Sequence, residues 1–289
     1  MLTIPCTADD RRSGGLAPQR LAPALAALRD DGVVALTDAV DPAHVAALRA
    51  RMLGDLDRVL ARGDVPFNWN ESNLQQSAPR EAPLLFRDVL ANDQAVAVCR
   101  ALMGAGLHNS FYSGNTTLPG RGAHQPIHVD NGHLWPAVAG IAPPHAVVVN
   151  LPLVDIDERN AIELWPGSHR DVARLHGETL EIPATDLDRR RAFAPPLQPT
   201  LPAGSLLIRD IRLWHAGTVN RAAGPRPMLA LIYCAAWWRG DDAFELPRAA
   251  EAHLRHPHLR TAARWVDHAI DHTGIDQAYG YAVRADATA

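Results

Sequence analysis

The stretch GSLLIRDIRLWHAG, residues 204–217, decides how this chain folds. It opens on Gly204, runs as a short apolar segment to Asp210, and closes on LWHAG, which contains His215. A short apolar run that begins at glycine is typical of a buried strand. A second run, residues 227–238, follows after a turn. The pattern therefore predicts two strands, with His215 between them and Arg226 at the start of the second.

Outward from this stretch, helices are expected first along the chain and strands later. Apolar residues at three-to-four spacing predict helices over 19–31, 41–62 and 92–103, and Asp41 is the expected N-cap of the second. Further strands are expected at 32–37, 107–115 and 146–155. Strands separated by turns, with helices on the N-terminal side, are compatible with a sandwich or a jelly roll, and the pattern alone does not fix the topology.

Length and composition indicate one domain over residues 1–289, because a chain with 47% hydrophobic residues can bury a full core. That core is expected over about 20–240. Residues 64–85 are polar and irregular, which predicts a substrate-facing loop or lid. The extension 247–289 is rich in histidine and arginine, and its expected structure is a solvated helix and loop rather than a metal site.

His128 and Asp130 give the first indication of chemistry. Their i, i+2 spacing suits a strand or strand end, where alternate side chains point the same way and can grip one ion. His215 would then complete the site from a distant strand. Two neutral imidazoles and one carboxylate are the set used for non-heme Fe(II), which leaves three coordination positions open. The residues therefore predict an iron site of the oxygenase type.

None of these residues is decisive alone. A His-x-Asp triplet arises about once by chance in a chain of this composition, and HVD at 128–130 could be a hydrogen-bonded turn. His215 could be a satisfied core histidine, and Arg226 a surface arginine between prolines. The triplet HGE at 176–178 could also begin a metal site. It lies in a polar stretch, however, whereas His128 has apolar neighbours, and we therefore prefer His128.

Taken together, the motifs resemble the phytanoyl-CoA dioxygenase family of Fe(II)/2-oxoglutarate oxygenases. The resemblance covers about residues 20–240. Its features are the HVD triplet, NAIELWPGSH at 160–169, the 204–217 stretch, and an arginine eleven residues beyond His215. Within the family the sequence is most similar to an aminoglycoside-tailoring dioxygenase. That similarity is carried by YSGNTTLPG (112–120), QPIHVD (125–130), HLWP (133–136), IRDIRLWH (208–215) and PRPMLA (225–230).

The resemblance implies a mainly β fold with flanking helices around a double-stranded β-helix, a jelly roll of the cupin type. It implies that Fe(II) is ligated by His128, Asp130 and His215, with 2-oxoglutarate and dioxygen as cosubstrates. It further implies that Arg226 binds the distal carboxylate of 2-oxoglutarate, and that Asn115 and Trp135 help to hold this cosubstrate. No catalytic residue beyond the metal ligands is implied.

The sequence departs from the family pattern at one position. Several relatives have a serine two residues after the distal histidine, which supports the 2-oxoglutarate carboxylate, whereas this chain has Gly217. Thr218 is the candidate substitute. Asp130 is informative in another way, because halogenating relatives have a small residue in place of the carboxylate. Halogenation is therefore not expected.

Charge and cysteine content exclude several other classes. A formal net charge of −4 and the lack of a basic tract disfavour nucleic-acid binding. The three cysteines, Cys6, Cys99 and Cys234, are widely spaced and odd in number, so free thiols are expected. No leader-like or membrane-spanning stretch is apparent. We therefore expect a cytoplasmic protein without a membrane partner; the sequence does not indicate an oligomeric state.

The predicted reaction is hydroxylation of an unactivated C–H bond in a small polar secondary metabolite. The resemblance points towards an amino sugar of the aminoglycoside type, oxidatively deaminated to a ketone. Expected substrate contacts are Gln125, His133 and Trp237. A catalytically silent binding protein that retains the fold is disfavoured by the intact triad, and two further alternatives stay open. One is a cupin-like metal-dependent hydrolase or isomerase that uses no 2-oxoglutarate. The other is a fatty acyl-CoA hydroxylase, although no basic cluster for the CoA phosphates is apparent.

Overall fold

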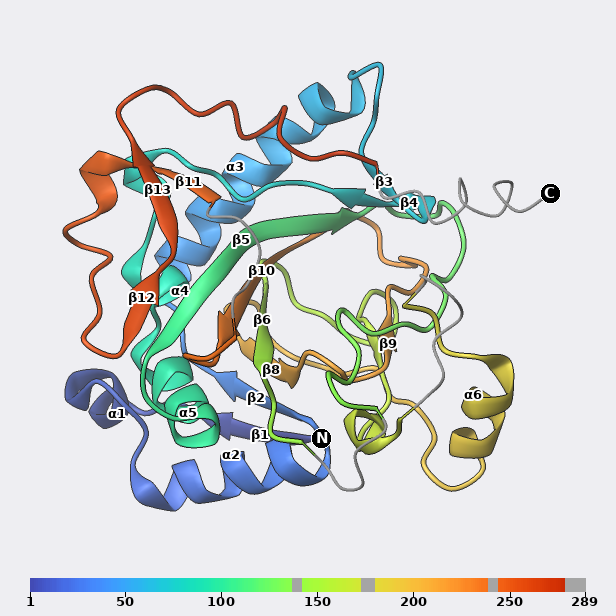
Figure 1. The fold of residues 1–289 in the computed structure, drawn as a ribbon. Coiled ribbons are helices and arrows are strands. Elements are labelled where there is room, and N and C mark those ends of the chain that lie inside the picture. The colour runs from blue at the N-terminus through green and yellow to red at the C-terminus, as the bar shows by residue number, and fades with distance from the viewer. Residues whose placement is uncertain (137–141, 173–179, 239–243, 279–289) are drawn as a thin grey trace.

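The fold is built on one mixed sheet with helices packed along one side (Figure 1). The computed structural model describes residues 1–136, 142–172, 180–238 and 244–278. The sheet has nine strands in the order β1-β2-β8-β6-β10-β5-β4-β3, with β12 beside β5. Its strands are β1 (Leu2–Pro5), β2 (Val33–Thr37), β3 (Phe67–Asn68), β4 (Asn70–Gln75), β5 (Leu107–Thr117), β6 (Ala146–Pro152), β8 (Leu206–Asp210), β10 (Arg226–Cys234) and β12 (Leu259–Thr261).

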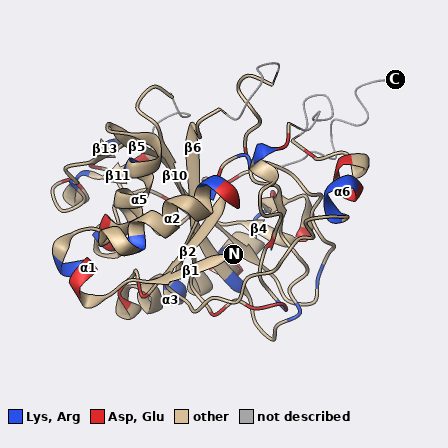
Figure 2. Cartoon of the chain, turned by 90° about the horizontal axis from the view of Figure 1, so that it is seen from below, with Lys and Arg blue, Asp and Glu red and all other residues tan. Residues whose placement is uncertain are grey.

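Two smaller sheets accompany it. They pair β7 (Glu163–Leu164) with β9 (His215–Ala216), and β11 (Phe244–Pro247) with β13 (Ala263–Val266). The helices are α1 (Ala8–Ser13), α2 (Pro18–Asp30), α3 (Pro42–Leu60), α4 (Arg87–Leu90), α5 (Asp93–Met103) and α6 (Ala184–Arg191), with 3-10 turns η1 (Ala82–Leu84), η2 (Ser168–Arg170) and η3 (Arg248–Ala250). In Figure 2, arginines and acidic residues are interspersed along the chain, as on α6.

Alternation along the central strands separates the two faces of the sheet. In β10, Leu229, Leu231 and Tyr233 are fully buried in the main hydrophobic core together with residues of α2, α3 and α5. The intervening Met228 and Ile232 belong to other clusters on the opposite face. Because side chains of a strand alternate between its faces, one face of the sheet binds the helices and the other is left for the site.

A second, shorter layer completes a jelly roll. It consists of the β7–β9 pair and isolated bridges that join residue 128 to 215, 156 to 201 and 164 to 197. The predicted jelly-roll core with flanking helices is therefore observed. The three predicted helices also form, and Asp41 accepts a hydrogen bond from the Ala43 amide at 2.8 Å, as its N-cap role requires.

Three regions differ from the sequence-based expectation. Residues 64–85, predicted to be a substrate-facing loop or lid, contain β3, β4 and η1 and extend the main sheet. The described part of the C-terminal extension contains η3, β12 and β13 rather than an α-helix. Residues 2–5 form β1, parallel to β2, so the sheet begins well before residue 20. In each case the segment is fixed by pairing with a distant strand, which local periodicity does not reveal.

Candidate metal centre

The three predicted metal ligands meet at one point. His128 and His215 form a reciprocal backbone pair, each amide donating to the other carbonyl at 3.0 Å. The Asp130 amide donates to the Ile211 carbonyl at 3.2 Å, which holds the second residue of the triplet beside the strand end. Ligand atoms of the two imidazoles and the carboxylate all lie within 4.8 Å of one another. Within the described residues no other group of three such side chains converges in this way.

Hydrogen bonds orient both imidazoles for metal binding. His128 Nδ1 donates to the Pro126 carbonyl at 2.8 Å, and His215 Nδ1 donates to the Leu213 carbonyl at 3.0 Å. Each ring is therefore a neutral tautomer with Nε2 available as a ligand atom. Burial lowers the pKa of His128 to about 4 and holds that of His215 well below its ordinary value, so both rings are neutral at pH 7.

Asp130 is held by an arginine that the sequence reading did not single out. Arg209 Nη2 pairs with Asp130 Oδ2 at 2.6 Å, while Asp130 Oδ1 lies 3.6 Å from His215 Nε2. Burial raises the pKa of Asp130, but the charge and the hydrogen bond of Arg209 lower it by more and keep the carboxylate ionised. Its side chain is 31% exposed, whereas that of Arg209 is 5% exposed. The cluster thus opens to solvent at Asp130, with Oδ1 free for a metal.

Trp69 is a second neighbour of the metal cluster that no sequence pattern indicated. Its ring meets that of His128 edge-on, with centroids 4.0 Å apart, and its φ of 66° is unusual for a non-glycine residue. Trp69 lies between β3 and β4, inside the segment that was expected to be a loop. That segment therefore does border the metal cluster, but as a strand connection.

Arg226 is fully buried at the first position of β10. Its Nε donates to the Asn160 carbonyl at 3.1 Å and its Nη1 to Asn115 Oδ1 at 2.9 Å. No carboxylate of the described chain pairs with it, and burial lowers its pKa to about 10. A buried guanidinium without a counter-ion is costly, so the geometry suits an anionic ligand. Arg226 and Asn115, which were each predicted to help hold 2-oxoglutarate, therefore lie side by side.

The structure explains why residue 217 is glycine. The Gln125 amide donates to the Gly217 carbonyl at 2.9 Å, and Gln125 Oε1 accepts from the Gly217 amide at 2.7 Å. A Cβ at position 217 would lie 2.7 Å from that same oxygen. Thr218 donates its hydroxyl hydrogen to the Ala161 carbonyl at 2.7 Å, so it is not free to donate elsewhere. The side chain of Gln125 thus occupies the space that a serine would need.

A model of the family described as Phytanoyl-CoA dioxygenase (PhyH) matches residues 28–228, which include the converging ligands and Arg226. The chain belongs to the phytanoyl-CoA dioxygenase family. Membership confirms the predicted family and the predicted enzyme class, an oxygenase that depends on Fe(II) and 2-oxoglutarate.

Solved structures with the same fold support the jelly-roll assignment. The α-ketoglutarate-dependent carbocyclase SnoK from nogalamycin biosynthesis is 20% identical with a TM-score of 0.58, covering 80% of this chain and 87% of its own. EctD from S. alaskensis, with 2-oxoglutarate and 5-hydroxyectoine, is 18% identical with a TM-score of 0.59 and 87% coverage of both chains. The epimerase SnoN, with Fe3+, α-ketoglutarate and nogalamycin RO, is 20% identical with a TM-score of 0.57, covering 76% of this chain and 85% of its own.

In this member of the phytanoyl-CoA dioxygenase family, the remaining predicted residues lie in different places. Trp135 and Trp237 are half-exposed and face each other, with ring centroids 6.0 Å apart. The described ring contact of Trp135 is thus with Trp237 and not with Arg226. His133 is half-buried, near Asp210 and Arg212. Gln125 is buried in the contact with Gly217. The competing triplet at 176–178 lies outside the described residues.

The family signature LWPGSH at 164–169 acts as a brace for the distal ligand. Trp165 donates its amide to the Trp214 carbonyl at 3.0 Å, and the Trp214 amide donates to Ser168 Oγ at 2.9 Å. His169 Nε2 donates to the Arg29 carbonyl at 3.2 Å, at the end of α2. Its ring packs on Gly32, whose φ of +75° and lack of Cβ make room for it. The signature therefore ties His215 to the helix layer.

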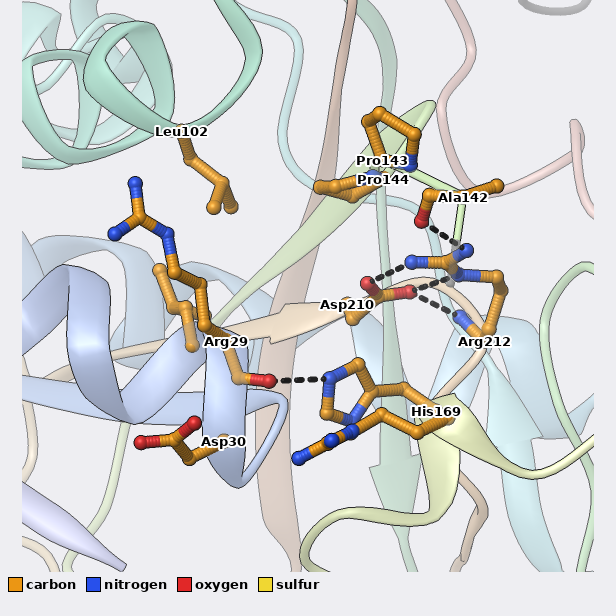
Figure 3. A pocket seen from close by; sticks show the side chains of 11 residues that line it. Arg29, Asp30, Leu102, Ala142, Pro143, Pro144, His169, Asp210 and Arg212 are labelled. Atoms are coloured by element: carbon orange, nitrogen blue, oxygen red, sulfur yellow. Dashed lines mark hydrogen bonds and ion pairs between the residues drawn. The ribbon is translucent and has the colours of Figure 1, made fainter. Parts of the chain in front are cut away.

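A cavity of about 380 Å³ lies on the other side of this brace (Figure 3). Its walls include His169, Leu102 and the Asp210–Arg212 pair, and none of the three metal ligands lines it. Arg212 binds both carboxylate oxygens of Asp210 and donates Nη1 to the Ala142 carbonyl at 2.9 Å. Asp210 and Arg212 thus satisfy each other, whereas the Nδ1 atom of His169 has no hydrogen-bond partner among the described residues. Among the described helices, none is long and apolar enough to span a bilayer.

The buried histidines predict an acid-sensitive apoprotein. In the unfolded chain an imidazole titrates near pH 6.5, whereas folding lowers the pKa of His128 to about 4, so its contribution to stability is lost as the pH falls between these values. When the pH falls from 7 to 5, protonation of this residue in the unfolded chain should lower the free energy of unfolding by about 2 kcal/mol. Urea denaturation with a chelator present measures this, and His128→Gln should be less pH-dependent by that amount. An unchanged pH dependence in the variant would contradict the assignment.

Proposed function

We propose that this chain binds Fe(II) through His128, Asp130 and His215, binds 2-oxoglutarate through Arg226, and oxidises a C–H bond of a small, polar, amine-bearing metabolite. When bound, iron and 2-oxoglutarate would supply the dioxygen-derived oxidant. The chain's own residues would fix the geometry of the metal, bind the cosubstrate's distal carboxylate and position the substrate, and such orientation provides much of the rate in cofactor enzymes.

The observation that carries this proposal is the buried, unpaired guanidinium of Arg226. A hydrolase or isomerase with the same three ligands has no use for such a charge, whereas a dicarboxylate that chelates the metal at one end needs a cation at the other. Thr218, three residues beyond His215, binds the Ala161 carbonyl, and the adjacent Asn160 carbonyl binds Arg226. These bonds link the arginine to the strand of the distal ligand. The free amide nitrogen of Asn115 is the candidate second donor.

Several observations support a small metabolite as substrate. SnoN was solved with nogalamycin RO and EctD with 5-hydroxyectoine, and both ligands are small molecules. SnoK also belongs to nogalamycin biosynthesis. Trp135 and Trp237 offer half-exposed aromatic surface for a ring to pack against. If the oxidised carbon bears an amine, the hydroxylated product loses ammonia to leave a ketone. Release of labelled ammonia from an amine-labelled substrate tests that outcome.

The test begins with purified apoprotein under anaerobic conditions. Addition of Fe(II) and 2-oxoglutarate should produce the weak visible charge-transfer band of a chelated keto acid. With the band established, succinate release can be screened over amino sugars and related metabolites, with acyl-CoA thioesters as the competing class. Metal binding without the band would favour the hydrolase or isomerase, and turnover of acyl-CoA alone would overturn the proposed substrate class.

A further inference from the structure

The end of the described chain forms a strap, residues 271–278, that is fastened to α3. His272 and Asp55 are both buried and pair through Nε2 and Oδ2 at 2.9 Å. Arg62, just beyond α3, donates to the carbonyls of Thr273 and Asp276 at 3.0 and 2.9 Å. In Figure 1 this segment, at the red end of the colour scale, crosses α3 and reaches the region of β3 and β4. The strap therefore runs from the helix layer to the edge of the main sheet.

Asp276 projects from the strap onto that edge without a counter-ion. Its carboxylate accepts from the Ser77 amide at 2.5 Å and from the Ser113 hydroxyl at 3.4 Å. Within the described residues no cationic side chain forms an ion pair with it; the charge of Arg80 favours its ionised form, but the Arg80 guanidinium donates to the carbonyls of Tyr112 and Glu245. Burial raises the pKa of Asp276. An enclosed carboxylate with only neutral donors has capacity left for a cation.

The partners of Asp276 place it on the face of the sheet that holds the metal cluster. Ser113 and Asn115 are two residues apart in β5 and so share one face. Asn115 binds Arg226 on that face. Asp276 therefore meets the inner face of the jelly roll rather than the helix layer.

A row of small side chains crosses this inner face towards the metal. Ser113 pairs with Ala230, and Ala230 pairs with Asn150 on the next strand. Asn150 accepts from Arg209 Nε at 3.1 Å, and Arg209 holds Asp130. Three strand spacings, from β5 through β10 and β6 to β8, separate Ser113 from Arg209, about 14 Å. Asp276 and the metal cluster thus lie at opposite ends of a floor that includes the methyl group of Ala230.

The neighbouring row of this face carries an aromatic side chain, Phe111, two residues from Ser113. Phe111 shares the face with Ser113 and pairs with Ile232. Its ring is 40% exposed, which is unusual for a phenylalanine within a central strand. A carboxylate and an exposed aromatic ring on the same face can together recognise an ammonium group on a saturated ring, since the carboxylate binds the charge and the aromatic ring packs on the apolar face.

We propose that Asp276, with Phe111, forms the far wall of the substrate chamber and binds an ammonium group of the substrate across the floor from the metal. This inference rests on the proposed function and specifies the recognition of its substrate. It makes the strap part of the active site, in which two unpaired charges select two ligands: Arg226 the cosubstrate carboxylate and Asp276 the substrate amine.

The probe is neamine, a small aminoglycoside with several primary amines, compared with its fully N-acetylated form. Binding is measured by calorimetry on anaerobic protein loaded with Fe(II) and 2-oxoglutarate. The wild type should bind neamine at least about tenfold more tightly than the acetylated form, and Asp276→Asn should remove this preference by weakening neamine binding about ten- to hundredfold. Asp276→Glu should retain part of it. Failure of the wild type to prefer the amine overturns the proposal.

His272→Gln is the matched control, because it releases the strap from Asp55 without altering the carboxylate. It should lower the melting temperature while the preference for the amine persists. If both variants reduce the affinity for neamine and for its acetylated form equally, Asp276 only holds the strap in place and the proposal fails. The charge-transfer band reports separately on the proposed function: its presence in Asp276→Asn shows that the iron and cosubstrate assignment stands whatever the amine result, whereas its absence in the wild type overturns that assignment instead.

Discussion

Replacement of Arg226 by alanine should weaken 2-oxoglutarate binding by about a hundredfold or more and leave Fe(II) binding nearly unchanged. Two charge-assisted hydrogen bonds to the distal carboxylate would be lost, each contributing about 1.5–3 kcal/mol when desolvated. The three metal ligands are untouched by the change. Titration of the charge-transfer band with 2-oxoglutarate measures the first quantity, and anaerobic titration with Fe(II) alone measures the second.

The stability of the Arg226→Ala apoprotein separates this role from a structural one. The substitution removes bonds to Asn115 and to the Asn160 carbonyl, but it also removes a buried charge that has no counter-ion, so the free energy of unfolding should change little. Arg226→Lys keeps the charge without the two parallel donors and should bind 2-oxoglutarate with intermediate affinity. The exposed Arg221 supplies the control, and its alanine variant should behave as wild type. Unchanged 2-oxoglutarate affinity in Arg226→Ala would refute the clamp.

The sequence predicted those parts of the molecule that local chemistry determines. The N-cap at Asp41 and the helix that follows depend on contacts within a few residues. The strand after Gly204 also depends on local pattern, as does its neighbour that begins at Arg226. Once these two strands are placed, His215 lies between them, and the reciprocal backbone pair with His128 brings in the triplet. The metal cluster was predictable because its spacing follows the period of a strand.

The other features depend on contacts between residues far apart in the chain. The segment with Trp69 has too few apolar residues to show the alternation of a strand. It is held instead by pairing with β5 and by buried polar side chains such as Gln76, which binds the Met52 carbonyl and Thr116. In the sequence, Arg209 is one charged residue within an apolar run, and only the fold shows that it pairs with Asp130. In the same way, only the folded structure shows that Gln125 fills the space beside Gly217.

Replacement of Asp130 by alanine should have two separable consequences. Loss of one of three protein ligands should weaken Fe(II) binding by more than about a hundredfold, since even indirect supports of a metal ligand contribute ten- to hundredfold. The change also leaves Arg209 buried without its carboxylate. Removing one partner of a buried pair costs about 3–5 kcal/mol, and because Asp130 is 31% exposed we expect about 2–3 kcal/mol here.

The double variant Asp130→Ala with Arg209→Met distinguishes the two effects. It removes the orphaned charge, so most of the lost stability should return, while Fe(II) binding should not. Urea denaturation in chelator measures the first and anaerobic titration the second. Asp157 is the matched control, because its side chain is as exposed as that of Asp130 and pairs at the same 2.6 Å, but its partner Arg159 is 64% exposed, against 5% for Arg209. Asp157→Ala should therefore barely affect stability, since the arginine it leaves is solvated. If Asp130→Ala were as stable as the wild type without metal, Arg209 would not depend on this carboxylate; if Fe(II) binding returned in the double variant, Asp130 would not be a ligand.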